Sequence, residues 1–107
     1  MMKWTVRFID EAKKDLKSLD NSQRIQVVKS IDKVSKNPLP NFEGGYGKPL
    51  GNKSNNNLTG YFKIKLLKLG IRVVYGLVRE QGIMKIIVIS IREEDTVYEI
   101  AIDRIGE

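Results

Sequence analysis

The chain has 107 residues, of which 41% are hydrophobic and 30% charged, and its formal net charge is +6. This length predicts one domain over residues 1–107 with a single modest core, and the composition is neither that of a disordered chain nor that of a membrane protein. Cysteine and histidine are both absent from the sequence, which excludes disulfides, zinc–thiolate sites, thiol nucleophiles and catalysis by imidazole. Any acid–base chemistry must therefore use lysine, arginine, tyrosine or carboxylates.

Positive charge is concentrated in the middle of the chain. Residues 48–92 hold nine Lys and Arg and one acid, Glu80, a net charge of +8, whereas residues 93–107 carry a net charge of −5. A polyanion-binding surface is therefore expected in the middle section, although a solvated basic face without a partner explains the same composition. The sequence shows no secretory core and no run long enough to span a membrane, which favours a cytoplasmic protein.

The apolar pattern of the first 40 residues predicts a strand followed by two helices. Apolar side chains alternate over residues 3–9, as in a strand. Asp10 is expected to cap a short helix, and one of residues 20–22 a longer helix with an apolar stripe. The prolines within residues 37–40 end the second helix, because proline lacks a backbone N–H and restricts the residue before it.

The remaining residues predict three strands and a final helix. Residues 41–57 are rich in Gly and Asn and are interpreted as a long loop, with room for a short extra strand around residues 47–50. Thr96 and Glu99 fit a capping box that opens a C-terminal helix. The expected strands cover residues 58–66, 71–79 and 83–91. The last of them is apolar at nearly every position, which predicts a strand inside the sheet.

This order of elements, β-α-α-β-β-β-α, indicates an α+β fold. Helices early in the chain and a meander late in the chain predict an antiparallel sheet with an N-terminal helical hairpin packed on one face, followed by a short C-terminal helix. The opposite face of the sheet is then expected to be an open, basic surface.

Four cations and a phenol are predicted to converge on that surface. Lys63 and Lys65 point away from the core, and a hairpin brings Arg72 close to them. Arg92 follows the last strand and can lean over the same surface, and Tyr98 begins the final helix just beyond. Such a cluster fits a phosphodiester better than a small carboxylate, because several cations can surround its oxygens.

Each of these residues also has a purely structural interpretation. The two lysines can simply keep a sheet face soluble, and Arg72 and Arg92 can pair with nearby acids. Tyr98 can be a core residue of an amphipathic helix. The acidic triplet at residues 93–95 is interpreted as solvated or as favouring a helix N-terminus, so neither a metal nor another cofactor is predicted.

Several short motifs together share the spacing of a known family. They are K-x-K at residues 63–65, R-V-V-Y at 72–75, an apolar strand that ends in Arg92, and V-Y at 97–98. With the order of elements, they resemble the RelE family of toxins from bacterial toxin–antitoxin pairs over nearly the whole chain. The sequence departs from the family pattern where Ile91 runs directly into Arg92, since the family often has one or two further residues there.

The resemblance implies an endoribonuclease that enters the ribosomal decoding site and cleaves the messenger without a metal. It also implies mRNA and ribosomal RNA as partners, together with an antitoxin protein, which the basic middle section predicts to be acidic. The family's catalytic residues fall on Lys63, Lys65, Arg72, Arg92 and Tyr98. The predicted RNA-binding residues are Lys48, Lys53 and Lys68.

Cleavage by the ribose 2′-OH would need a base, a stabilised phosphorane and a proton for the 5′-oxygen. Lys63 or Lys65 can serve as the base, because like charge and desolvation lower a lysine pKa. Arg72 and Arg92 would hold phosphate oxygens, and Tyr98 would stack on a base or contact the 2′-OH. The residues leave two alternatives open: a ParE-type toxin that acts on DNA gyrase, and a non-catalytic RNA-binding module.

Overall fold

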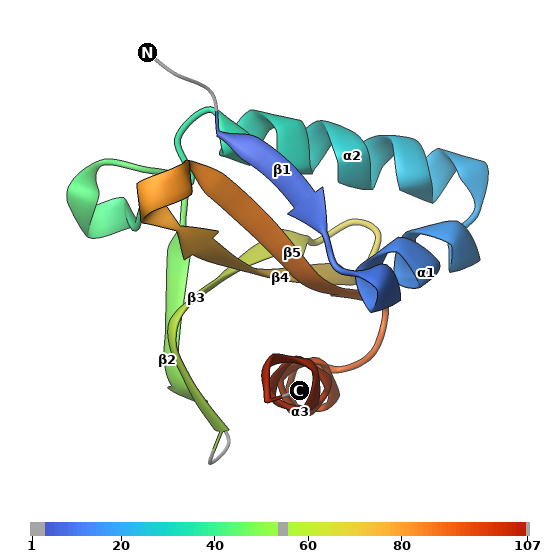
Figure 1. Cartoon of the computed structure of the whole chain (residues 1–107). Coiled ribbons are helices and arrows are strands. Elements are labelled where there is room, and N and C mark those ends of the chain that lie inside the picture. Colours follow the sequence, from blue (N-terminus) through green and yellow to red (C-terminus); the bar gives the residue numbers. More distant parts are fainter. Residues whose placement is uncertain (1–3, 54–55, 107) are drawn as a thin grey trace.

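The structure, a computed structural model, describes residues 4–53 and 56–106 and contains one five-stranded sheet with helices on both faces (Figure 1). No helix in the described part of the chain is both long and apolar enough to cross a membrane. Two short 3-10 turns cover Asn41–Glu43 and Arg79–Gln81. The strands and helices are β1 (Thr5–Phe8), α1 (Asp10–Ser18), α2 (Asn21–Ser35), β2 (Lys48–Lys53), β3 (Asn56–Leu66), β4 (Ile71–Val78), β5 (Ile83–Ser90) and α3 (Glu94–Ile105).

The strands are arranged in the order β1-β5-β4-β3-β2. The predicted α+β fold, with a helical hairpin on one face and a C-terminal helix, is confirmed, and β5 lies inside the sheet as expected. The sheet is mixed rather than wholly antiparallel, because β1 pairs with β5 in parallel. It also has a fifth strand, β2, in the Gly-rich segment that has room for a short extra strand.

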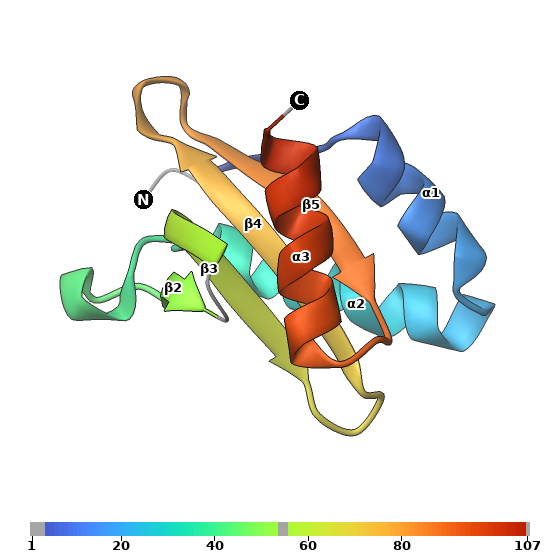
Figure 2. The ribbon, with the colours of Figure 1, turned by 90° about the horizontal axis from the view of Figure 1, so that it is seen from below.

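Two apolar cores lie on opposite faces of the sheet. Helices α1 and α2 cover one face, where Val27 and Ile31 pack with Phe62 and Ile64 of β3. Helix α3 lies across the other face (Figure 2), and its core includes a buried Val97. Strand β5 contributes side chains to both cores, which explains why it is apolar at nearly every position.

The helix starts agree only in part with the predicted caps. Asp20 caps α2, since its carboxylate accepts from the Gln23 N–H at 2.8 Å while the Gln23 side chain accepts from the Asp20 N–H at 3.1 Å. Asp10 is already inside the first turn of α1, so the cap predicted for it is wrong. The capping box predicted at Thr96 is also wrong, because α3 begins two residues earlier, at Glu94.

The Gly-rich segment after α2 is held against the sheet by a buried tyrosine. The Tyr75 hydroxyl donates to the Pro38 carbonyl at 3.0 Å, and burial raises the pKa of Tyr75. Gly47 passes so close that a Cβ there would lie 2.8 Å from the same hydroxyl. The segment can approach the ring only because Gly47 has no side chain, and it then enters β2.

An ion pair completes the edge of β5 where β1 ends. The pairing of β1 with β5 stops at Phe8 and Ile86. Beyond that point, the Asp15 carboxylate accepts from the Ile89 N–H at 3.0 Å, and the Arg104 guanidinium donates to the Ile87 carbonyl at 2.9 Å. Asp15 and Arg104 also bind each other through contacts of 2.6 and 3.1 Å, and both side chains are 18% exposed. The pair therefore joins α1, β5 and α3.

Candidate functional site

Basic side chains form a row across three neighbouring strands. In the β3–β4 hairpin, Lys65 lies directly opposite Arg72, and in the β2–β3 pair Lys48 lies directly opposite Lys63. Directly opposed residues share one face of a sheet, as do residues two apart on a strand. Lys48, Lys63, Lys65 and Arg72 therefore lie on one face, the face that α3 crosses, and we call them the basic row.

An acid from α3 enters this row. The Lys65 ammonium lies 2.6 Å from Glu94 Oε1, and Arg72 Nε lies 3.4 Å from the same oxygen. The Lys65 ammonium lowers the pKa of Glu94 below its usual range; partial burial opposes this shift, and the charges of Arg72 and Lys63 add to it. The expected open basic surface is therefore wrong, because α3 packs on this face and brings a carboxylate to it.

Arg72 also fixes the loop that leads into α3. Its terminal nitrogen donates to the Arg92 carbonyl at 3.2 Å, and the Ser90 hydroxyl accepts from the Arg92 N–H at 3.0 Å. These bonds turn the chain directly after β5, so α3 starts earlier than its local sequence predicts.

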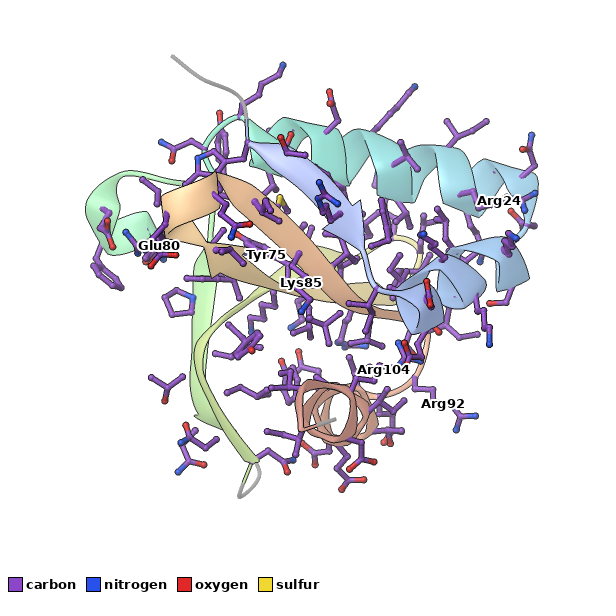
Figure 3. All side chains as sticks on the ribbon, in the orientation of Figure 1. Arg24, Tyr75, Glu80, Lys85, Arg92 and Arg104 are labelled. Atoms are coloured by element: carbon purple, nitrogen blue, oxygen red, sulfur yellow. The ribbon has the colours of Figure 1, made fainter. Side chains whose placement is uncertain are left out.

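The Arg92 side chain lies apart from the basic row, which differs from the expectation. It is exposed and extends away from the molecule (Figure 3). It lines a cleft between α1 and α3 together with Asp15, Ser90 and Arg104. Among the hydrogen bonds and ion pairs of the described residues, Arg92 meets the row through its backbone carbonyl, which accepts from Arg72.

Tyr98 lies at the site but is buried. It is 3% exposed and packs in the α3 core, so its ring offers no face for stacking on a base in this arrangement. Its hydroxyl is buried and has no hydrogen-bond partner within residues 4–53 and 56–106. Burial raises the pKa of Tyr98, the charge of Glu94 adds to the rise, and the charge of Arg72 opposes it. The hydroxyl therefore lies near the charges at the end of the row.

Tyr98→Phe is expected to leave the free energy of unfolding unchanged or to increase it. The substitution removes a buried hydroxyl that has no partner, so no hydrogen bond is lost. Tyr75→Phe is the matched control, because it removes a bonded hydroxyl and is expected to cost about 1 kcal/mol. Urea unfolding of both variants checks this. A larger loss for Tyr98→Phe than for Tyr75→Phe would show that the Tyr98 hydroxyl has a stabilising partner.

Two further residues predicted to bind RNA, Lys53 and Lys68, are not part of the basic row. Lys68 is exposed in the turn between β3 and β4. Lys53 ends β2, and its side chain lies outside the described residues. Within the part of the chain that the structure describes, no three His, Cys, Asp or Glu residues are grouped so as to hold a metal ion.

Sequence reasoning missed Glu94 as part of the site. The available signal was the acidic triplet at residues 93–95, which directly follows the last strand and a strongly basic middle section. That proximity predicts an ion pair between the two regions, but it does not indicate which acid reaches which cation.

Comparison with known proteins identifies relatives along the whole chain. No family model matches the sequence. A protein of Escherichia coli described as a RelE-like toxin is 29% identical over 104 residues, which cover 96% of this chain and 98% of that protein. The crystal structure of the isolated E. coli RelE toxin is 25% identical with a TM-score of 0.69, and the match covers 95% of this chain and 98% of that one. The chain is therefore similar to RelE toxins in sequence and in fold.

The resemblance inferred from the motifs is therefore confirmed for this RelE-like chain. The crystal structure of the RelBE2 toxin–antitoxin complex from Mycobacterium tuberculosis is also similar, with 28% identity and a TM-score of 0.68. That match covers 86% of this chain and 94% of the other.

Proposed function

We propose that the RelE-like chain is the toxin of a type II toxin–antitoxin pair and that it cleaves messenger RNA on the ribosome. The basic row carries this proposal, above all the direct pairing of Lys65 with Arg72 across the β3–β4 hairpin. Two cations fixed opposite each other on a rigid hairpin suit a phosphodiester, whose oxygens can accept from both. Cations kept only for solubility would not need to be partly buried, as Lys65 and Arg72 are at 30% and 25% exposure.

The proposed chemistry is a transfer of the phosphoryl group within the RNA strand. The ribose 2′-oxygen attacks the adjacent phosphorus and loses its proton to Lys63 or Lys65, acting as an uncharged amine. The new bond joins the 2′-oxygen to phosphorus, and the bond to the 5′-oxygen breaks. A protonated group of the site gives a proton to that leaving oxygen. Arg72 stabilises the additional negative charge that the phosphorane carries.

The ribosome would supply the orientation that this small surface lacks. The basic row offers charge on a sheet face, and we propose that the ribosome positions the messenger against it. Orientation of the reacting atoms can contribute about 7 kcal/mol or more to a barrier. We therefore expect slow cleavage of free RNA and fast cleavage of translated messenger.

The proposed partner is an acidic antitoxin that binds over the basic row. The similar M. tuberculosis protein was crystallised as a toxin–antitoxin complex, which supports a protein partner for this chain. Residues 48–92 carry a net charge of +8, so an acidic segment would be attracted to them. Binding there would also block access of RNA to the row.

A messenger with one 2′-deoxynucleotide at the cleavage position tests the proposal. On programmed ribosomes, the chain is expected to cut the all-ribose messenger, to leave a 2′,3′-cyclic phosphate at the cut end, and to leave the 2′-deoxy messenger intact at that position. Cleavage of both messengers would contradict attack by the 2′-oxygen. Salt-sensitive binding without any cut would select the non-catalytic RNA-binding module instead.

A further inference from the structure

The acid within the basic row is placed like a bound anion. A single oxygen of Glu94 contacts two cations, the ammonium of Lys65 at 2.6 Å and Nε of Arg72 at 3.4 Å. These cations come from two different strands, and the glutamate comes from a third element, the first turn of α3. A carboxylate oxygen and a phosphate oxygen accept from ammonium and guanidinium groups in the same way.

We infer that Glu94 occupies the position at which a phosphate oxygen of the RNA binds, so that the chain carries its own competitor for the substrate. The inference rests on the proposed function, because it concerns the same site. It adds that binding of RNA to Lys65 and Arg72 requires the Glu94 carboxylate to leave.

The ion pair is not needed to hold α3 in place. The helix is fixed at its other end by Arg104, which binds Asp15 and the Ile87 carbonyl, and along its length by the buried Val97 and Ala101. By contrast, the side chains of Glu94, Lys65 and Arg72 are 36%, 30% and 25% exposed, so this pair is only partly shielded from water and adds less to stability than a buried pair. Glu94 can therefore leave the cations while α3 stays on the sheet.

Polar atoms beside the carboxylate lack the partners that a purely structural pair would supply. Arg72 Nε and Glu94 Oε1 are both buried and lie 3.4 Å apart, a contact that is long for a hydrogen bond. The buried Tyr98 hydroxyl has no hydrogen-bond partner among the described residues. Buried polar atoms are normally bonded, so the long contact of Arg72 Nε and the unbonded Tyr98 hydroxyl beside it point to a ligand site. A phosphate has more acceptor oxygens than the single carboxylate oxygen that now contacts the row.

The competitor lowers the apparent affinity for RNA. When only a fraction of the molecules has the site open, the apparent dissociation constant rises by the inverse of that fraction. The free chain is then expected to bind RNA more weakly than the basic row alone would, because Glu94 competes for the same cations. Glu93, the preceding residue, is exposed and has the same charge, but among the described residues the ion-pair partner of Lys65 and Arg72 is Glu94 and not Glu93.

Glu94→Gln and Glu93→Gln form a matched pair for the test. Both remove one negative charge at neighbouring positions, so their long-range effects on an RNA are nearly equal. The probe is a short 2′-O-methyl RNA with a fluorescent label, which cannot be cleaved by its own 2′-oxygens. Its dissociation constant is measured by anisotropy at fixed ionic strength, with the full chain and without ribosomes.

Glu94→Gln is expected to bind the probe about tenfold more tightly than Glu93→Gln, because only the first frees the two cations. Equal dissociation constants for the two variants would overturn the inference. Glu94→Asp serves if the glutamine variant does not fold: it keeps the charge but shortens the side chain, and it too is expected to bind more tightly than the wild type. Affinity of Glu94→Asp at or below that of the wild type would overturn the inference as well.

The binding test of Glu94 has an outcome whether or not the chain cleaves RNA. If the wild-type chain never cuts a messenger but Glu94→Gln binds the probe more tightly, the proposed function fails and the internal competitor stands. If the chain cuts messengers but Glu93→Gln and Glu94→Gln bind alike, the proposed function stands and the competitor is rejected.

Discussion

Lys65→Ala is expected to reduce cleavage of messenger on programmed ribosomes by about 100-fold or more, the usual contribution of a positioned acid–base group. Lys65 lies at the centre of the basic row, directly opposite Arg72 and in contact with Glu94. Its loss removes both a proton acceptor and a cation for the phosphorane. The measurement is the rate of appearance of cut messenger under single-turnover conditions.

Two further variants separate the roles of this lysine. Lys29→Ala is the control, because Lys29 is an exposed lysine of α2, on the opposite side of the sheet, and it should cleave like the wild type. Lys65→Arg keeps the positive charge but cannot act as a base, since a guanidinium stays protonated. Loss of cleavage in Lys65→Arg indicates proton transfer, and retention indicates charge alone. Wild-type rates in Lys65→Ala would remove this residue from the proposed site.

Asp15→Ala is expected to lower the free energy of unfolding by about 3 kcal/mol, the range seen when one partner of a buried, hydrogen-bonded ion pair is removed. The substitution leaves the Arg104 guanidinium without its counter-charge and the Ile89 N–H without its acceptor. Both groups lie at the part of β5 that β1 does not reach, where no strand can replace the lost bond. Urea unfolding followed by circular dichroism gives the measurement.

Asp10→Ala is the matched control for this prediction. Asp10 is on the same helix and also faces a cation, Lys13, at 3.8 Å, but it is almost fully exposed, so its loss should change stability little. The double variant Asp15→Leu with Arg104→Met should recover part of the loss, because no unpaired charge is left behind. Equal stability of Asp15→Ala and Asp10→Ala would show that the pair does not support the β5 edge.

The parts of the fold set by local pattern were predictable. The alternation of residues 58–66 predicts both the strand and the face that carries Lys63 and Lys65, and the apolar run of β5 predicts a strand covered on both sides. The cap of α2 was also predictable, since Asp20 and Gln23 lie three residues apart. These features depend on neighbours in the sequence.

The errors concern features that depend on distant residues. The start of α3 is set by Arg72, which binds the Arg92 carbonyl from 20 residues away, and not by Thr96 and its local capping motif. The Arg92 side chain itself is exposed and extends away from the molecule (Figure 3). The basic row was predictable as a set of cations on one face. Helix α3 covers the basic row and brings Glu94 into it. This arrangement follows from packing between distant segments, which no short motif encodes.

The ion pair between Asp15 and Arg104 also has a consequence for folding during translation. Its partners are 89 residues apart, so during translation the aspartate is synthesised long before the arginine emerges from the exit tunnel. The final helix can therefore make this contact only after Arg104 has been synthesised, and contacts of such long separation slow the folding of a small protein. A nascent chain that stalls before Arg104 lacks this ion pair. The end of β5 can then pair with another polypeptide.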